Sequence, residues 1–186
     1  EMLRSLVGSE MCIRDSVGAM LAASLEVPWV DLDEISGPLY AEVGWPPEVI
    51  AEQRRRLGWT AFHAAFEPAL AHAVKRCAAL SSQAIVSFGA GHSHLTDPSL
   101  RAHVARALEG VTVVLLRPSP DVGRSVRLLR ERCRQSKWTD WHLDGVDWLH
   151  RWCTDGLDEQ LADATIYTDG KSPQETTDEV SRLLPR

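Results

Sequence analysis

The fold is decided by the stretch Ala84-Ile85-Val86-Ser87-Phe88-Gly89-Ala90-Gly91-His92-Ser93-His94. Its first five residues form a short apolar run, which is typical of a buried central strand in a parallel sheet. A glycine loop follows directly, and in open α/β sheets ligands bind just beyond the carboxyl ends of the strands. Because Gly89 and Gly91 carry no Cβ, the backbone there can lie close to a ligand. The stretch therefore predicts a buried strand that ends in a ligand site.

Outside this stretch, apolar strands and helices alternate along the chain. Further strands are predicted at 27–33, 111–116 and 164–168, and helices at 17–25, 46–58, 60–79, 97–108, 121–134 and from Ser172 onwards. Three of the four strands are apolar enough to be buried on both faces. This alternation predicts an α/β protein, a three-layer α/β/α domain with a parallel sheet of about five strands.

Several helix ends are marked in the sequence. Asp97 and Pro98 are an N-cap and first-turn pair. The segment Ser172-Pro173-Gln174-Glu175 is a capping box with proline at the first helical position. Gly58 is expected to end one helix, and Pro68 is expected to bend the next.

The composition limits the classes of protein that fit. The length of 186 residues suits one domain, and 44% hydrophobic residues suffice for a core. The net charge of −6 argues against a general nucleic-acid-binding protein. The four cysteines form no C-x-x-C pair, and no apolar run reaches the length of a membrane span or signal peptide. We expect a monomeric cytoplasmic protein that binds a small molecule and neither nucleic acid nor membrane.

Residues 1–16 differ in character from the rest of the chain. From Ser5 to Ser16 they show no period of either 2 or 3.6. They resemble a translated adaptor peptide that occurs fused to unrelated environmental sequences; the alternative is an ordinary, irregular N-terminus. We expect 1–16 to be non-native, 17–186 to form a single domain, and the first strand of the sheet to be missing or degraded.

Asp31 and Asp33 lie two residues apart at the end of the predicted strand 27–33. In a strand this spacing places both carboxylates on one face. One carboxylate would then bind Mg²⁺, and the other would orient or deprotonate an alcohol. The alternative is that Asp33 caps the next turn while Asp31 is solvated.

Other groupings of polar residues point less clearly to chemistry. His92 and His94 have the spacing of a metal-binding pair, but no further ligand motif accompanies them. We therefore interpret them as polar loop residues near the site. The sequence contains no G-x-S-x-G nucleophile elbow, so serine-type catalysis is not supported.

A basic stripe is predicted on the helix 121–134. Arg124, Arg127, Arg130 and Arg134 follow one another at spacings of three, three and four. Arginine binds phosphate through paired donors, so the stripe fits a phosphate clamp. A solvated helix face that pairs with the acidic, Trp-rich segment beyond it is the alternative.

From Val17 onwards these pieces resemble the shikimate kinase family of P-loop small-molecule kinases. The resemblance rests on the helix at Val17-Gly18, the strand Trp29-Val30-Asp31-Leu32-Asp33, the helix start at Phe62-His63, the loop Gly89-Ala90-Gly91, an arginine-bearing lid at about 121–160, and the strand 162–168. It implies a P-loop fold with ATP and Mg²⁺ as cofactors.

The resemblance also implies roles for individual residues. Asp31 and Ser16 would hold Mg²⁺, and Asp33 would contact the acceptor and orient its attacking hydroxyl. His63, Gly89, Ala90 and Gly91 would line the acceptor side. Arg124, Arg127 and Arg130 would neutralise the charge on the transferring phosphoryl group.

The acceptor side departs from the family pattern at three points. His63 stands where the family has the arginine that binds the substrate carboxylate, and the following glutamate is displaced by one residue. Ala90 replaces the middle glycine, and the lid carries a longer Trp-rich segment. Arg54, Arg55 or Arg56 would then be a substitute carboxylate clamp.

The largest departure is in the phosphate loop G-x-x-x-x-G-K-[ST]. Gly8, Arg14 and Ser16 are the degenerate counterparts of its nucleotide-binding residues. Ile13 adds a side chain where glycine is needed, and Asp15 places a negative charge beside the phosphates. We expect this chain to bind ATP poorly.

These observations lead to a functional expectation with two alternatives. The chain is expected to resemble a kinase that transfers a phosphoryl group from ATP to a hydroxyl of a small anionic metabolite, with a defective nucleotide site. A related sugar-acid kinase is the first alternative. The second is a non-catalytic nucleotide- or metabolite-binding domain with a degenerate phosphate loop.

Overall fold

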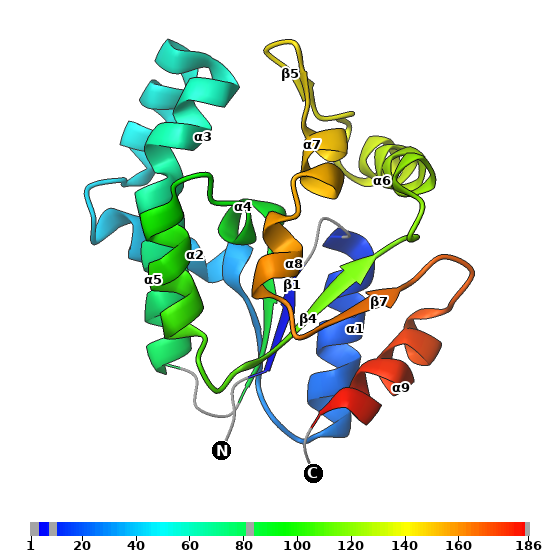
Figure 1. Cartoon of the computed structure of the whole chain (residues 1–186). Helices are drawn as coiled ribbons and strands as arrows, with labels where there is room; N and C mark the ends of the chain where they lie inside the picture. Colours follow the sequence, from blue (N-terminus) through cyan, green and yellow to red (C-terminus); the bar gives the residue numbers. More distant parts are fainter. Residues whose placement is uncertain (1–3, 8–10, 81–83, 185–186) are drawn as a thin grey trace.

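The computed structural model describes residues 4–7, 11–80 and 84–184. Its centre is a five-stranded parallel sheet in the order β2-β3-β1-β4-β7 (Figure 1). The strands are β1 (Arg4–Val7), β2 (Trp29–Asp31), β3 (Ile85–Phe88), β4 (Thr112–Arg117) and β7 (Ala164–Tyr167). All the pairings between neighbours are parallel, as helical crossovers require. The predicted α/β class is confirmed.

The middle strand of the sheet, β1, is one that we did not predict. Its residue Leu6 lies beside Ser87 of β3 on one side and Val114 of β4 on the other. The expectation that the first strand is missing or degraded is therefore wrong. Four residues are too few to show a period, and the strands that pair with β1 lie far away in the sequence.

Helices cover both faces of the sheet (Figure 1). The helices α1 (Met11–Ser24) and α9 (Pro173–Leu183) pack together on one face. The other face carries α2 (Leu32–Ala41), α3 (Pro47–Leu80) and α5 (Pro98–Ala107). In β4, Val113 and Leu115 pack on the α3 side, whereas Val114 and Leu116 pack on the α1 side. Because both faces are buried, the strand is a continuous apolar run in the sequence.

The helix α3 is broken at Gly58, where φ is 72° and ψ is 173°. Glycine adopts this conformation without the steric penalty that a Cβ would bring. The predicted end of one helix at Gly58 and start of another near Thr60 are therefore confirmed. Non-helical angles occur at Gly58 and not at Pro68, which lies inside the second helical segment, and the bend expected at Pro68 stays a prediction.

The predicted caps lie at observed helix starts. Asp97 accepts hydrogen bonds from the backbone N–H groups of Ser99 and Leu100 at the start of α5. Ser172 and Glu175 form the reciprocal capping box of α9. The arginine-rich helix, α6 (Val122–Lys137), begins at Asp121, whose side chain accepts from the Arg124 N–H.

The acidic, Trp-rich segment that follows α6 is folded into strands and helices. It contains the hairpin of β5 (His142–Leu143) and β6 (Val146–Asp147), and the helices α7 (Trp148–Thr154) and α8 (Leu157–Leu161). Asp144 and Gly145 connect the two strands with φ values of 52° and 73°. Two successive residues with positive φ are typical of a two-residue hairpin turn, for which Asp-Gly is a preferred sequence.

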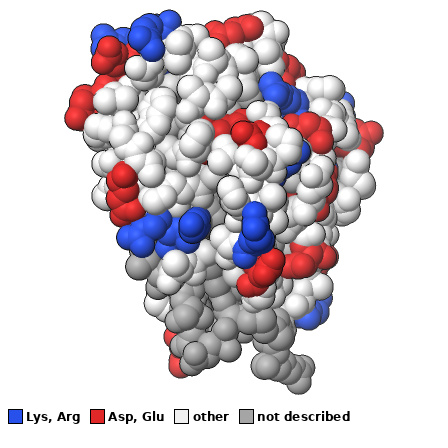
Figure 2. Space-filling view, turned by 60° about the vertical axis from the view of Figure 1, so that its left-hand side comes forward, with Lys and Arg blue, Asp and Glu red and all other residues white. Residues whose placement is uncertain are grey.

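The surface carries charges of both signs. In Figure 2, the Lys and Arg side chains of the described residues form several separate groups with Asp and Glu between them. No helix in the described ranges is long and apolar enough to cross a lipid bilayer.

Candidate functional site

A cavity of about 260 Å³ lies at the carboxyl end of β3, where α3 and the α6–α7 region approach each other. It is lined by Asp33, Trp59, Phe62, His63, Phe66, Leu70, Gly89, Ala90, Gly91, Cys133, Trp141, Leu149 and Trp152. These include all five residues that we expected on the acceptor side, namely Asp33, His63, Gly89, Ala90 and Gly91. The structure therefore brings together residues from three separate segments of the sequence.

The glycine loop approaches Asp33 closely. It continues from β3 into the short helix α4 (Ala90–Ser93). A Cβ added at Gly89 would lie 2.5 Å from Asp33 Oδ1 and 2.7 Å from Oδ2, so any larger residue there would displace the carboxylate. Ala90 is buried against the α6–α7 cluster, in which its methyl group is part of the core. Gly89 is thus the position of the loop at which the site requires glycine.

The two aspartates lie on different elements. The strand β2 ends at Asp31, whose Oδ1 accepts a hydrogen bond of 3.0 Å from the Asp33 N–H and caps α2. Asp33 is therefore in the first turn of a helix, and the prediction that both carboxylates project from one strand is wrong. The alternative that we considered is also reversed, because Asp31 is the cap. Burial raises the pKa of Asp31, and the charge of Arg14 partly offsets this.

Arg14, which begins the second turn of α1, lies among the acidic side chains of the site. Its side chain is 1% exposed. Its Nη2 lies 2.8 Å from Asp15 Oδ1, 3.3 Å from Asp33 Oδ2 and 3.6 Å from Asp31 Oδ1. A buried guanidinium needs such partners, since an unpaired buried charge is costly. Arg14 is thus the counter-ion of the carboxylates that we expected to serve Mg²⁺ and the acceptor.

This arrangement does not fit the predicted Mg²⁺ site. Asp31 already accepts the Asp33 N–H and faces the Arg14 guanidinium, whose positive charge would repel a metal ion. Ser16 is exposed on α1. Among the described residues, no group of three His, Cys, Asp or Glu side chains is arranged to hold a metal ion. Gly8, the third predicted nucleotide-binding residue, lies outside the described residues.

His92 links Asp33 to the interior of the protein. Its Nε2 lies 2.7 Å from the Tyr40 hydroxyl, and its Nδ1 lies 3.4 Å from Asp33 Oδ1. Burial lowers the pKa of His92 to about 4 and raises that of Tyr40 to about 12. In the neutral imidazole the Tyr40 O–H donates to Nε2, which leaves the proton on Nδ1, facing Asp33. Tyr40 therefore fixes the His92 ring beside the carboxylate that faces the cavity, although Nδ1 itself makes no hydrogen bond with the described residues.

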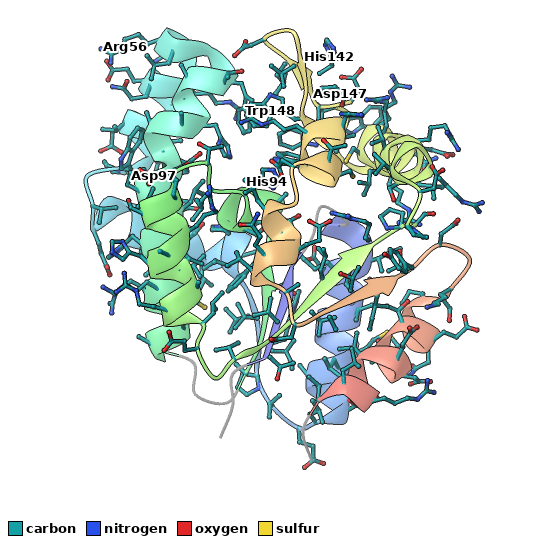
Figure 3. All side chains as sticks on the ribbon, viewed as in Figure 1. Arg56, His94, Asp97, His142, Asp147 and Trp148 are labelled. Carbon is teal, nitrogen blue, oxygen red and sulfur yellow. The ribbon has the colours of Figure 1, made fainter. Side chains whose placement is uncertain are left out.

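His94 has different partners from His92, so the two do not share a metal site. Its Nε2 contacts Asp155, and its Nδ1 lies 3.5 Å from Asp158 Oδ1. Both carboxylates belong to the segment from the end of α7 to α8. Figure 3 shows His94 near the centre of the molecule, below α7. The buried contact fastens the C-terminal part of the lid to the glycine loop.

Glu67 connects α3 to the loop that follows α4. It is 2% exposed and accepts hydrogen bonds from the backbone N–H groups of Thr96 and Asp97 and from the Thr96 hydroxyl. His63 lies one helical turn earlier, with its Nδ1 3.9 Å from Glu67 Oε1. Burial lowers the pKa of His63 to about 4, so this histidine is neutral at pH 7. His63 therefore brings no positive charge to the cavity.

The lid is attached to both sides of the cavity. Asp144, at the tip of the β5–β6 hairpin, accepts a hydrogen bond of 2.8 Å from the Thr60 N–H, just after the break in α3. A Cβ at Gly58 would lie 3.0 Å from the same carboxylate oxygen. At the other end of the hairpin, Asp147 pairs with Arg130 of α6. The hairpin thus spans the space between α3 and α6.

The arginines of α6 do not line the cavity. Arg124 pairs with Asp169, Arg130 pairs with Asp147, and Arg127 lies in an outer groove with Arg134. The helix instead directs Val126, Leu129 and Cys133 toward the cluster around the cavity. The predicted apolar and basic sides of this helix are therefore observed, but the structure does not bring the basic side to Asp33.

The arginines of α3 that we expected to bind a substrate carboxylate also lie outside the lining of the cavity. The Arg54 guanidinium lies over the Trp59 ring, 4.9 Å from its centroid, and Arg55 is exposed. Arg56 donates to Gln53 and lies on the outer side of α3 (Figure 3). None of these three arginines lines the cavity.

The walls of the cavity are the part of the site that we did not predict. Trp59, Trp141 and Trp152 line it, and the ring centroids of successive members lie 5.4 and 5.0 Å apart. Trp148 projects from the start of α7 toward α3 (Figure 3), 6.1 Å from Trp59 between centroids. The sequence does contain many tryptophans, but which of them line one cavity depends on contacts between distant segments.

Comparisons with known proteins agree with the fold. No protein family and no curated protein matches the sequence. Among solved structures, shikimate kinase from Acinetobacter baumannii in complex with shikimate has a TM-score of 0.64 at 18% identity, over 98% of this chain and 92% of that one. Shikimate kinase from Aquifex aeolicus vf5 has a TM-score of 0.62 at 19% identity, over 97% and 95%. A gluconokinase from Sinorhizobium meliloti 1021 has a TM-score of 0.53 at 18% identity, over 98% and 92%. The chain therefore has the fold of the shikimate kinase-like P-loop kinases.

Proposed function

We propose that this chain carries the acceptor half of a small-molecule kinase together with a disabled nucleotide half. One observation supports the acceptor half most strongly: Asp33, His63 and the loop 89–91, chosen by resemblance to kinases, line one cavity. The disabled half is inferred from Ile13 and Asp15 in the phosphate-loop register and from Arg14, which pairs with the site carboxylates.

The proposed reaction is transfer of the γ-phosphoryl group of ATP to an alcohol in the cavity. The Asp33 carboxylate accepts the hydroxyl proton while the alcohol oxygen forms a bond to the γ-phosphorus and the bond to the β,γ-bridging oxygen breaks, releasing ADP. Tyr40 fixes the His92 ring beside Asp33. Positioning of this kind is the main task of a protein in phosphoryl transfer.

Not all of the α6 arginines keep the role that the resemblance gives them, which is to neutralise charge on the transferring phosphoryl group. The residues concerned are Arg124, Arg127 and Arg130. Arg130 pairs with Asp147 across the lid, and none of the three lines the cavity. The proposal therefore rests on Arg124 and Arg127, in the first two turns of α6, contacting a phosphoryl group that lies outside the acceptor cavity. Arg124 would have to exchange Asp169 for phosphate, a more strongly charged partner.

A second candidate is a metabolite-binding domain without catalysis. It is favoured by the pairing of buried Arg14 with Asp33, which neutralises the proposed base. In this state the chain would bind the acceptor and leave it unchanged.

A repaired variant distinguishes the two candidates. Because 4–7 already form a strand, only 8–16 need replacement, by a complete loop G-x-x-x-x-G-K-S-T. We expect this variant to transfer phosphate from ATP to an alcohol in a panel of ring-bearing and linear alcohols, detected by ³¹P NMR. The unrepaired chain is the control and is expected to give no product. A repaired variant that binds ATP but phosphorylates no member of the panel would favour the binding domain.

A further inference from the structure

We propose that the acceptor is an uncharged, ring-bearing alcohol, in contrast to the anionic metabolite that the family resemblance implies. This inference deepens the proposed function, since it concerns the same cavity. It rests on the walls of the cavity, on the charges that line it and on the places that nearby arginines occupy.

Most side chains that line the cavity are apolar, and several of them are flat aromatic rings. Aromatic rings are contributed by Trp59, Phe62 and Phe66 from α3 and by Trp141 and Trp152 from the lid, and leucine side chains by Leu70 and Leu149. Such surfaces favour a ligand with an apolar ring, because stacked or edge-on contacts add to the gain from burying apolar area. Besides Asp33, the unpaired polar atoms of the lining residues are the indole N–H groups of Trp59, Trp141 and Trp152 and Nε2 of His63. A linear, fully hydroxylated acceptor would therefore lose more of its hydration than these few partners replace.

The charges in the cavity oppose an anion. Among the described residues that line the cavity, Asp33 is the one acidic side chain, and no Lys or Arg stands beside it in the lining. Its partner Arg14 lies outside the lining and is shared with Asp15 and Asp31. His63, at the position of the carboxylate-binding arginine, is 5% exposed and neutral because burial lowers its pKa to about 4. A carboxylate in this space would be buried without a counter-ion and would face a second carboxylate.

Three arginines near the cavity have other partners. Arg54 lies over the lining residue Trp59, and Arg151 lies 5.1 Å from the centroid of the Trp148 ring, which does not itself line the cavity. Arg14 lies 3.3 Å from Asp33 and also pairs with Asp15 and Asp31. None of the three is among the residues that line the cavity, and each already contacts an aromatic ring or carboxylates.

The test is calorimetric titration of the chain as it exists, without nucleotide, at pH 7.5. The matched probes are 4-(hydroxymethyl)benzamide and 4-(hydroxymethyl)benzoate, which share ring and hydroxymethyl group and differ in charge. We expect the amide to bind about tenfold or more tightly than the benzoate, because a buried unpaired charge costs more than 1.4 kcal/mol, the equivalent of tenfold. Xylitol, which is uncharged but has no ring, is expected to bind more weakly than the amide.

His63→Arg tests the cause of this preference. The added guanidinium is expected to reverse the order, so that the benzoate binds more tightly than the amide. His103→Arg adds the same charge at an exposed position on α5 and is expected to leave the order unchanged. If His63→Arg fails to fold, as judged by circular dichroism, the titrations of the unaltered chain decide the matter.

Three results would overturn the inference: equal or tighter binding of the benzoate by the unaltered chain, tighter binding of xylitol than of the amide, or no binding of the amide. Because no ATP is used, these results are independent of the kinase assay. Absence of phosphoryl transfer with the preference for the amide intact would reject the proposed function and leave the ligand class standing.

Discussion

Asp33→Asn is expected to lower the rate of phosphoryl transfer by the repaired variant about 10²–10⁴-fold, the usual contribution of a general base. The reason is geometric. Asp33 lies beside Gly89 and lines the cavity, and its Oδ1 faces the buried imidazole of His92. An asparagine keeps the shape but cannot accept the proton of the alcohol. The measurement is the single-turnover rate with a saturating acceptor.

The matched control for this substitution is Glu34→Gln. Glu34 is the next residue in the same helical turn and is exposed. Its substitution removes one negative charge at nearly the same place, and we expect a rate within about twofold of the parent, since exposed charge pairs contribute little. If Asp33→Asn lowers the rate no more than Glu34→Gln does, Asp33 is not the base.

Acidification is expected to destabilise the protein steeply between pH 6.5 and pH 4. Burial lowers the pKa values of His63 and His92 to about 4. In the unfolded chain an imidazole has a pKa near about 6.5, so within this window the unfolded state binds more protons and stability falls as the pH falls. Each histidine is expected to cost about 2 kcal/mol at pH 5 relative to pH 8. Urea unfolding at a series of pH values measures this directly.

The variants for this experiment are His63→Gln, His92→Gln and, as control, His103→Gln. Each substitution of a buried histidine should reduce the loss of stability on acidification by the amount that this histidine contributes. Substitution of the exposed His103 should leave the dependence of stability on pH unchanged. The absolute stability of the buried variants is not the readout, because glutamine changes the packing. If a variant that carries both His63→Gln and His92→Gln loses as much stability between pH 7 and pH 5 as the parent, these histidines do not titrate as proposed.

The position of the cavity could be predicted because its signals are local. The apolar run before Gly89 indicates a buried strand, and the position of the loop after that strand indicates where a ligand binds. Asp33 was placed correctly at the cavity although its helix was assigned to a strand. The hydrogen bond from Asp33 N–H to Asp31 ends the strand early, and capping competes with strand formation in a way that periodicity does not reveal.

The central strand and the hairpin of the lid were missed for different reasons. β1 has four residues, and its place in the sheet depends on pairing with β3 and β4. The hairpin at Asp144-Gly145 did have a local signal, since Asp-Gly between apolar residues is a strong turn sequence, and we overlooked it.

The aromatic walls depend on packing between distant segments. Trp59 of α3 and Trp141 of the lid are far apart in the sequence and come into contact because the lid packs against α3. The abundance of tryptophan in the sequence therefore does not show which rings line the cavity. The contacts of Arg14, which we expected at the nucleotide site, also depend on packing between distant segments. Its pairing with Asp31 and Asp33 requires α1 and β2 to lie side by side.

Titration of the unaltered chain with ATP and Mg²⁺ tests most directly the claim that the acceptor half is intact and the nucleotide half disabled. The comparison is with the variant in which 8–16 are replaced by a complete phosphate loop; Arg14→Lys alone is the control, because Ile13 and Asp15 remain. We expect a Kd weaker than about 1 mM for the unaltered chain and the control, and at least about a hundredfold gain for the repaired variant. Micromolar binding by the unaltered chain, or no gain on repair, would show that the nucleotide half is not disabled as proposed.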